Sequence, residues 1–481
     1  RKDMSYTQTE QTVAVPLPKG KKNAVQTGCI CIMLSVAMSG LALSTLGSSI
    51  LESVGALRYV SLFSILGALG VTIMTPIGGK LGDLTGRRNI VIVSGIICAF
   101  AGIGIAFVHS ILPLMILRLI VGLAQGTFTA APYIIVGLIN EKKDVPKVMG
   151  YLAAAIAIGG FGGSIIAGVL TDLGYLELAI LVPVIPLIIG VVLIGMNLPN
   201  KKREEKVAID VGGILALVAA LVSILLALYY APTVGWTKPM VLAGFALGIL
   251  AIFVLIKVEE KAQEPVIPLQ LFENKEYTTL LIISFLAYFY LAAMNTYIPI
   301  VATRVLGTST GLAGSLQMPR TIICMLLPAA AGAWVGKAYE NNWKAMAIAT
   351  LFAAVPMAVL GFTTATTSVF LIYFLLALTG ISEGFRAVSI TPAVQRTLQT
   401  EEIGIGTALV TFVTSLSGSI SSSIYGVAYE INTVSDAANA ENIRNGCNAV
   451  FLVAAAVSFL GFLIVFFIFR SQILKKKETE A

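Results

Sequence analysis

Long apolar stretches alternate with short polar segments along almost the whole chain. A run of about 20 apolar residues is long enough to cross a bilayer as a helix, and the pattern predicts fourteen such spans. We place them at residues 28–49, 57–78, 89–109, 113–138, 147–170, 176–197, 210–230, 239–257, 277–300, 311–335, 343–363, 367–392, 404–428 and 448–470. An even number of spans predicts that both ends of the chain lie on one side of the membrane.

The composition and the charge pattern agree with this prediction. Apolar residues make up 57% of the chain and charged residues 12%, with a mean hydropathy of +0.91. The polar segments on the side of the two termini hold 25 of the 32 Lys and Arg residues, and those on the other side hold four. The positive-inside rule therefore predicts a multi-pass protein of the cytoplasmic (inner) membrane with both termini cytoplasmic. The net charge of +7 then reflects topology, and we expect no nucleic-acid partner. The first 27 residues are polar, so no signal peptide is expected.

The segment 79–88, between the second and third spans, reads Gly-Lys-Leu-Gly-Asp-Leu-Thr-Gly-Arg-Arg. Its glycines permit a sharp turn, and Asp83 can accept hydrogen bonds from Arg87 or from the N–H groups of a helix end. The pattern resembles the loop between the second and third helices of the major facilitator superfamily of transporters. The resemblance implies a conformational latch formed by Gly79, Asp83, Gly86, Arg87 and Arg88.

Internal repeats indicate two related halves. Residues 122–126 read Gly-Leu-Ala-Gln-Gly and residues 380–384 read Gly-Ile-Ser-Glu-Gly, an offset of 258, while residues 79–83 recur weakly at 332–337. Similar offsets predict two homologous six-helix bundles, with spans seven and eight as an inserted pair. We therefore expect an all-α membrane protein with the major facilitator fold. Its parts are a cytoplasmic tail (1–27), an N-terminal six-helix bundle (28–199), basic linkers with the inserted helix pair (200–276), a C-terminal six-helix bundle (277–470) and a second tail (471–481).

The inserted segment carries a more specific resemblance. The residues Asp210 and Gly213, the pair Gly235-Trp236 and the pair Glu264-Pro265 are similar to the extra helix pair of the fourteen-helix drug:proton antiporter group. The resemblance implies a proton-coupled secondary transporter that exports amphipathic compounds.

Charged residues inside spans are few, and such charges are usually functional because they are costly in a bilayer. Glu383 is the only carboxylate well inside a span, and Arg386 lies three residues later on the same helix face. Arg118 resembles the arginine that the superfamily associates with proton transfer. We expect Glu383, Arg118 and Arg386 to serve proton coupling. The alternative is a Glu383–Arg386 ion pair that only holds the helix.

Polar and aromatic residues in other spans suggest a substrate site. Arg320, which follows Gln317, lies about 14 Å from the outer end of its span and is the candidate for binding an anionic group. Tyr288 and Asn295 are seven residues apart and share a helix face, which suits an amphipathic ligand. Gln125 completes the predicted substrate-binding set. The alternative is that the aromatic residues only pack helices or lie at the membrane interface.

Two departures from the exporter pattern leave the direction of transport open. Residues 159–168 resemble the antiporter motif of drug exporters, but Ser164 and Ala167 replace its proline and glycine. Gly40 stands where the fourteen-helix exporters usually carry an aspartate, so we expect Arg320 to lack a fixed acidic partner. Overall resemblance favours multidrug-type efflux. The departures favour uptake of an amphipathic organic anion.

Other classes of function have less support. The segment 332–337 lacks the spacing of a phosphate-binding loop. A membrane-embedded enzyme would need clustered catalytic groups, and a channel would need rings or filter loops; the sequence has neither pattern. We expect a monomer that binds a small amphipathic organic substrate and protons within the lipid bilayer, with no cofactor and no metal.

Overall fold

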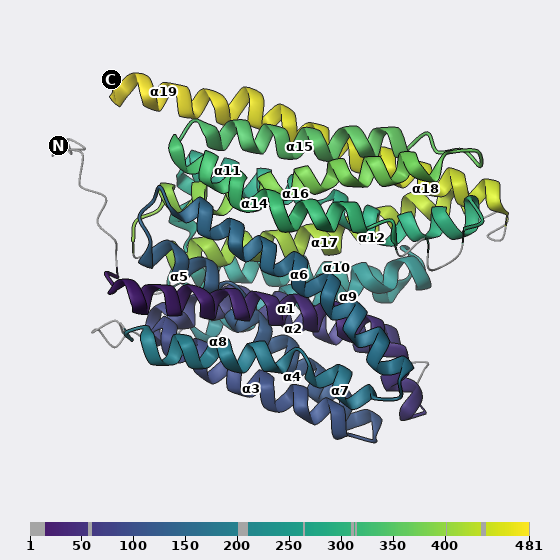
Figure 1. Ribbon diagram of the computed structural model, residues 1–481, viewed down its shortest axis with the longest axis horizontal. Helices are drawn as coiled ribbons and strands as arrows, with labels where there is room; N and C mark the ends of the chain where they lie inside the picture. The colour runs from purple at the N-terminus through teal and green to yellow at the C-terminus, as the bar shows by residue number, and fades with distance from the viewer. Residues whose placement is uncertain are drawn as a thin grey trace.

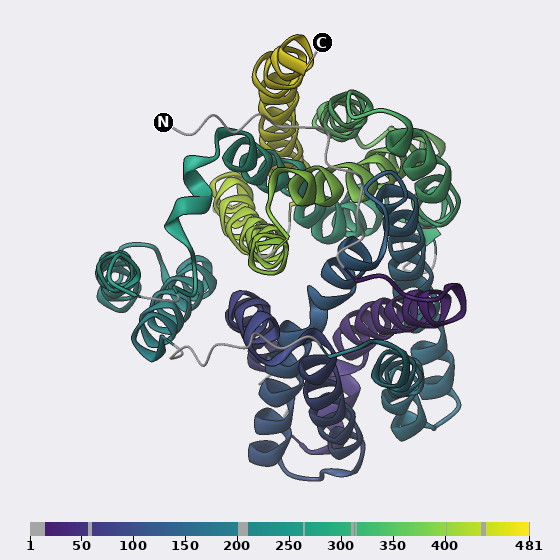
Figure 2. The same cartoon turned by 90° about the vertical axis from the view of Figure 1, so that its left-hand side faces the viewer.

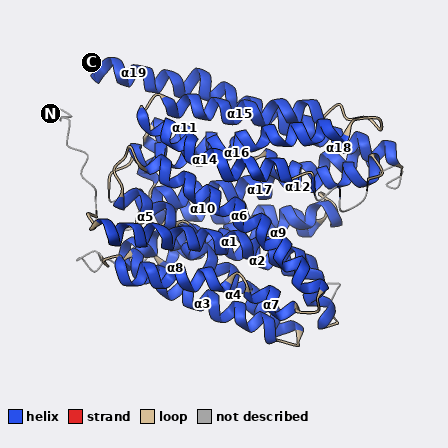
Figure 3. Ribbon diagram, viewed as in Figure 1, coloured by secondary structure: helices blue, strands red, loops and turns tan. Residues whose placement is uncertain are grey.

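The computed structural model describes residues 15–55, 60–200, 210–262, 265–308, 312, 315–400, 402–433 and 439–480. Within these ranges all regular secondary structure is helical, as Figure 3 shows. Thirteen helical stretches in the described ranges are long and apolar enough to cross a membrane. The remaining predicted span, 57–78, coincides with α2 except for residues 57–59, which lie outside the described ranges. The prediction of an all-helical membrane protein is confirmed.

The helices follow one another as Figure 1 labels them. The first group is α1 (Lys19–Ser53), α2 (Val60–Thr85), α3 (Arg87–Phe107), α4 (Ile111–Thr129), α5 (Ala131–Ile139), α6 (Val145–Asp172), α7 (Leu176–Leu181) and α8 (Val184–Asn197). Then come α9 (Val211–Val234), α10 (Pro239–Glu259) and the short η2 (Leu269–Glu273). The last group is α11 (Lys275–Tyr288), α12 (Tyr290–Ile300), η3 (Val301–Val305), α14 (Met318–Lys337), α15 (Asn341–Leu360), α16 (Val369–Thr397), α17 (Ile403–Thr433), α18 (Ala440–Leu463), η4 (Ile464–Phe469) and α19 (Arg470–Glu480).

Some predicted spans are made of two helices in line. The span 113–138 divides into α4 and α5, and Pro132 lies in the first turn of α5. The span 176–197 divides into α7 and α8, with Pro183 directly before α8. Proline has no backbone N–H and fixes its own φ, so it fits the first turn of a helix and interrupts a longer one.

The helices pack in three groups. Helices α1 to α8 contact mainly one another, and so do α11 to α18. Helices α9 and α10 contact mainly each other, and α9 also touches α2 and α17. In the view of Figure 2 the α9–α10 pair stands to one side of the other helices. Helix α1 begins and α19 ends at the left of Figure 1.

The first and third groups meet near residues 79–88, and we call this part of the molecule the 79–88 end. A Cβ on Gly79 of α2 would overlap Ala408 of α17. On α14, a Cβ on Gly332 would overlap the backbone of Pro146, and Gly150 of α6 lies equally close to Pro328. Small residues at these crossings let the helix backbones touch, as in other membrane helix pairs.

Candidate functional site

Three charged side chains form a cluster between α14 and α16. The carboxylate of Glu383 accepts from Arg386 Nε at 3.1 Å, and its other oxygen pairs with Arg386 Nη2. Arg320 Nη2 lies 3.9 Å from Glu383 Oε2. All three side chains are at most 20% exposed. One carboxylate thus faces two guanidinium groups, which leaves a formal charge of +1 in a largely buried place.

The expectation that Arg320 lacks an acidic partner is wrong. Glu383 of α16 supplies that partner, and no aspartate on the first span is needed. Arg386 remains the closer partner of Glu383, because its guanidinium makes two hydrogen bonds to the carboxylate. The prediction of a Glu383–Arg386 ion pair is confirmed as geometry.

Aromatic side chains surround this cluster. The guanidinium of Arg386 lies over the ring of Tyr288, 4.2 Å from the ring centre, in cation–π geometry. The fully buried Tyr290 comes from α12 and lies within electrostatic range of Glu383 and Arg320. Tyr133 of α5 lies within the same range of Glu383 and Arg386. The cluster therefore lies within electrostatic range of a helix of the first group as well as of the third.

Three buried polar atoms beside the cluster lack a hydrogen-bond partner among the described residues. They are Arg320 Nε, Gln317 Oε1 and Tyr290 Oη. Gln317 precedes α14 and Arg320 lies in its first turn, next to Pro319. Unmade hydrogen bonds at buried atoms cost free energy, so these atoms mark a place where a ligand or water would be stabilised.

The other predicted substrate residues lie elsewhere. Asn295 is exposed on α12. Gln125 is buried in the first helix group, where its Nε2 donates to Ser39 Oγ at 2.9 Å. Neither of these two residues contacts the charged cluster in the structure as described.

Arg118 also lies apart from the cluster. Its Nε donates to the carbonyl oxygen of Phe63 at 3.2 Å, and its guanidinium lies 5.1 Å from the centre of the Phe63 ring. The described residues include no carboxylate in an ion pair with Arg118. It bridges α4 and α2, and a Cβ on Gly67 would overlap its guanidinium.

Three of the predicted latch residues, Gly79, Asp83 and Arg87, meet at the start of α17. Arg87 forms an ion pair with Asp83 and donates through Nη1 to the carbonyl oxygen of Gly79 at 2.8 Å. A Cβ on Gly404, in the first turn of α17, would overlap both Arg87 and Asp83. The carboxylate thus approaches the positive end of the α17 dipole. Gly86 has φ +95°, a conformation that favours glycine.

A second contact at the 79–88 end was not predicted from the sequence. Gln395 of α16 donates through Nε2 to the carbonyl oxygen of Tyr133, at 2.9 Å, and to Thr407 Oγ1, at 3.1 Å. Arg396 donates to the carbonyl oxygen of Lys142 at 3.0 Å. Gln395 and Arg396 follow Pro392 inside α16. In the sequence, two polar residues at the end of a span are equally typical of a solvent-exposed helix end, so the contact could not be predicted.

The glycine-rich run of residues 159–168 packs mainly within the first helix group. A Cβ on Gly159 would overlap the carbonyl of Leu34, and one on Gly163 would overlap Met38, so both glycines bring α6 onto α1. Gly162 faces open space. The side chain of Ser164 is outside the description.

Comparison with known proteins identifies the family. A family model described as Major Facilitator Superfamily matches residues 28–422. The chain belongs to the major facilitator superfamily. It is therefore a multi-pass membrane transporter, in a family of transporters rather than enzymes.

Several bacterial relatives in this superfamily are multidrug transporters. The multidrug transporter protein MdtP of Bacillus subtilis is 27% identical over 411 residues, which cover 85% of this chain and 75% of MdtP. Multidrug resistance protein 3 of the same organism is 23% identical, with 84% and 78% of the chains covered. The quinolone resistance protein NorB of Staphylococcus aureus is 25% identical, with 82% and 84% covered.

Solved structures of the superfamily share the fold. The human organic anion transporter MFSD10 (TETRAN) superposes with a TM-score of 0.66 at 13% identity, covering 93% of this chain and all of MFSD10. The proton:xylose symporter XylE superposes with a TM-score of 0.63 at 14% identity, covering 94% of this chain and 96% of XylE. At these identities the likeness concerns the fold alone.

Proposed function

We propose that this transporter couples proton movement to the efflux of amphipathic organic solutes by alternating access, as a multidrug-type exporter of the cytoplasmic membrane. The observation that carries the proposal is the buried cluster of Arg320, Glu383 and Arg386 beside Tyr288. A titratable acid, two cations and an aromatic face suit both a proton and an amphipathic ligand. The multidrug relatives support the direction of transport.

In this proposal Glu383 carries the proton, and Arg386 sets the charge around it, whereas Arg118 is held by Phe63 away from the cluster. The substrate lies against Tyr288 and reaches the groups around Arg320. Gln317 borders the same place. The two six-helix bundles (28–199 and 277–470) rock around this site in a monomeric protein.

The latch residues govern the rocking in the same proposal. The ion pair of Asp83 and Arg87 at the start of α17, with Gly79, Gly86 and Arg88 around it, holds the two bundles together at the cytoplasmic face. Opening the transporter toward the cytoplasm separates Asp83 from the α17 helix end.

The direct test is transport by the purified protein in proteoliposomes with an imposed pH gradient. Export of amphipathic compounds should be saturable and should depend on the gradient, and Glu383→Gln should remove that dependence. Flux that ignores the gradient in the wild type would contradict proton coupling.

The predicted membrane orientation needs a test of its own. Cysteines introduced after Glu10 and after Lys477 should resist an impermeant reagent in intact cells, because both termini are proposed to be cytoplasmic. Reaction of either site would overturn the orientation.

A second candidate function is proton-driven uptake of an amphipathic organic anion. The charge of +1 in the cluster and the unsatisfied donor Arg320 Nε favour it. The start of α14 adds the positive end of a helix dipole beside Arg320. A carboxylate or sulfate matches the bidentate geometry of a guanidinium.

The two candidates predict opposite linkage between proton and substrate. A bound anion would compete with Glu383 for the guanidinium groups and so favour its protonation, so that anion and proton bind together, as symport requires. A bound cation would favour ionised Glu383, so that cation and proton compete, as antiport requires. Equilibrium binding measured as pH falls therefore decides: stronger binding supports anion uptake, and weaker binding supports cation efflux.

A further inference from the structure

Two carboxylates meet where the inserted helix pair reaches the 79–88 end. Asp210 caps α9, and its Oδ1 accepts from the N–H of Gly213 at 2.8 Å. Glu259 is the last residue of α10 and is only 5% exposed. Its Oε1 accepts from the N–H groups of Val266 and Ile267 at 3.1 and 3.2 Å. Each carboxylate thus fixes the backbone at one end of the pair.

Each carboxylate also has a buried oxygen without a hydrogen-bond partner among the described residues, namely Asp210 Oδ2 and Glu259 Oε2. The two groups both lie beside Gly213. A Cβ on that glycine would lie 3.0 Å from Glu259 Oε1 and would overlap Asp210 Oδ2. Two acids this close repel each other when both are ionised, and burial adds to the cost of the second charge.

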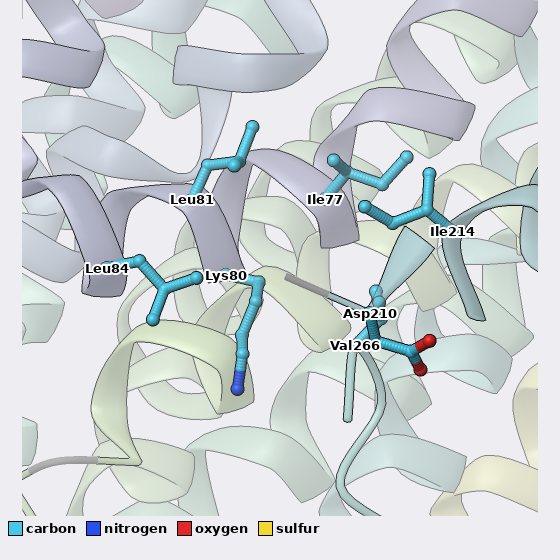
Figure 4. Close-up of a pocket in the computed structure, with 7 residues that line it drawn as sticks. All are labelled: Ile77, Lys80, Leu81, Leu84, Asp210, Ile214 and Val266. Atoms are coloured by element: carbon cyan, nitrogen blue, oxygen red, sulfur yellow. The ribbon is translucent and has the colours of Figure 1, made fainter. Parts of the chain in front are cut away.

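Lys80 of α2 supplies the opposite charge. It lies within electrostatic range of Glu259 and lines a small cavity together with Asp210. Figure 4 draws this cavity, whose other walls are apolar: Ile77, Leu81, Leu84, Ile214 and Val266. The charged groups that face Glu259 from the packed helices are therefore Asp210 on α9 and Lys80 on α2. On its other side, Asp210 borders a second cavity together with Lys257 and Lys261.

Asp210 and Glu259 lie at the ends of a helix pair that contacts both six-helix bundles. Helix α9 touches α2 at the 79–88 end, and farther along it touches α17, where Ser423 Oγ donates to the carbonyl oxygen of Leu228 at 3.1 Å. Helices α2 and α17 are the two helices that meet at Asp83 and Gly404. The inserted pair therefore lies across the seam that must open between the bundles.

We propose that Asp210 and Glu259 form a proton-binding site, separate from the Arg320–Glu383–Arg386 cluster, that fastens the inserted helix pair to α2 through Lys80. One proton shared by the pair removes their mutual repulsion and the cost of a second buried charge, so the pair stays docked against α2. Loss of that proton in alkaline solution restores the repulsion and loosens α9. The site then makes the seam between α2 and α17 sensitive to pH on the side of the 79–88 loop.

Hydrogen–deuterium exchange of the full-length protein in lipid nanodiscs tests this without substrate. The amides to follow are those at the start of α9 and around Val266 and Ile267, in acidic and in alkaline buffer, with rates corrected for intrinsic pH dependence. Wild-type protein should exchange roughly threefold faster at alkaline pH at these amides. Asp210→Asn and Glu259→Gln together should give the same rate at both pH values.

Two further variants sharpen the result. Lys80→Gln should raise exchange at the start of α9 in alkaline buffer, and Lys80→Arg should restore the wild-type pattern. Glu260→Gln is the matched control, because Glu260 is exposed and pairs only with Lys257 at 3.4 Å among the described residues; it should keep the wild-type response. Exchange that does not depend on pH in the wild type, or an unchanged response in the Asp210→Asn, Glu259→Gln protein, would overturn the proposal. Since no substrate or gradient is used, either result is independent of the proposed transport function.

Discussion

Helices α4 and α16 carry the two copies of one repeated segment, yet the copies do different things. Gln125 and Glu383 hold the same place in this repeat. Gln125 is neutral, buried and bonded to Ser39. Glu383 is ionisable and lies between two guanidinium groups, Arg386 and Arg320. Corresponding positions thus hold a packing residue in one half and a charged cluster in the other.

The backbone around these positions is nevertheless alike. A Cβ on Gly122 of α4 would overlap the carbonyl of Gly67 on α2. A Cβ on Gly380 of α16 would meet the backbone of Arg320 on α14 at 2.8 Å. The same glycine therefore brings the corresponding helix pairs together. The comparison teaches that the repeat supplies the same helix packing twice, whereas a carboxylate stands at this position in the C-terminal copy and an amide in the N-terminal copy.

The largest expected effect comes from removing the acid. We expect Glu383→Gln to lower gradient-driven flux at least about tenfold, because no other carboxylate lies in the cluster to carry a proton. Flux in proteoliposomes with and without a pH gradient measures this. The melting temperature of the variant separates lost coupling from lost folding, since two buried arginines would then face no acid.

A swapped variant tests the same comparison more severely. Gln125→Glu combined with Glu383→Gln moves the acid to the corresponding place in the N-terminal half. We expect it to stay uncoupled, because the arginine of that helix, Arg118, is engaged by the carbonyl of Phe63. Restored coupling would mean that an acid works equally well in either half, which would contradict the difference between positions 125 and 383.

The next largest effect is expected at the latch, whose counterpart in the repeat, residues 332–337, differs in sequence. Asp83→Asn should slow turnover about tenfold or more while substrate binding persists, because the contact with the start of α17 loses its charge. The weak repeat at 332–337 has no acid at the matching place, where Gly336 stands. Lys337→Gln, beside it, should therefore change turnover little. Equal effects of the two variants, measured as transport rate per protein, would count against a special role for Asp83.

The sequence predicts contacts between residues that are close in the chain better than contacts between residues on different helices. The pairing of Glu383 with Arg386 follows from their spacing on one helix. The approach of Arg320 to Glu383 does not, because it joins two helices whose relative rotation no local pattern encodes. The fold itself was predictable, since fourteen apolar runs, the charge asymmetry and the repeats all agree.

Contacts between the two bundles were the least predictable part. Gln395 bonds to the carbonyl of Tyr133, across 262 residues of sequence. Its only signal is an amide near the end of an apolar helix, which fits a solvated surface equally well. Gly404 is similar: the sequence shows a glycine at a helix start, and only the fold shows that Arg87 and Asp83 occupy the space of its missing side chain.

A smaller effect is expected at the arginines, again unequal between the halves. Arg320→Lys should weaken the binding of an amphipathic anion severalfold, because an ammonium cannot reproduce bidentate pairing, and Arg320→Gln should weaken it more. Arg118→Lys should change binding little, since the guanidinium of Arg118 is fixed inside the first bundle. Unchanged anion affinity in both Arg320 variants, or competition only by lipophilic cations, would favour the efflux of cationic compounds.

The smallest effect should come from Gln125, and it is the most direct test of the neutral half. Gln125→Ala removes one buried hydrogen bond to Ser39, which is worth about 1 kcal/mol of stability. The hydroxyl of Ser39 borders a cavity of about 20 Å³ together with Gln125, and a water there can replace the lost partner. We therefore expect a melting temperature lower by a few degrees and transport within about twofold of wild type.

Ser39→Ala should behave alike, and the double variant should cost less than the sum of the two single changes because both remove the same bond. Loss of transport in Gln125→Ala at unchanged stability would place part of the transport chemistry in α4, and the assignment of all of it to the C-terminal half would then fail.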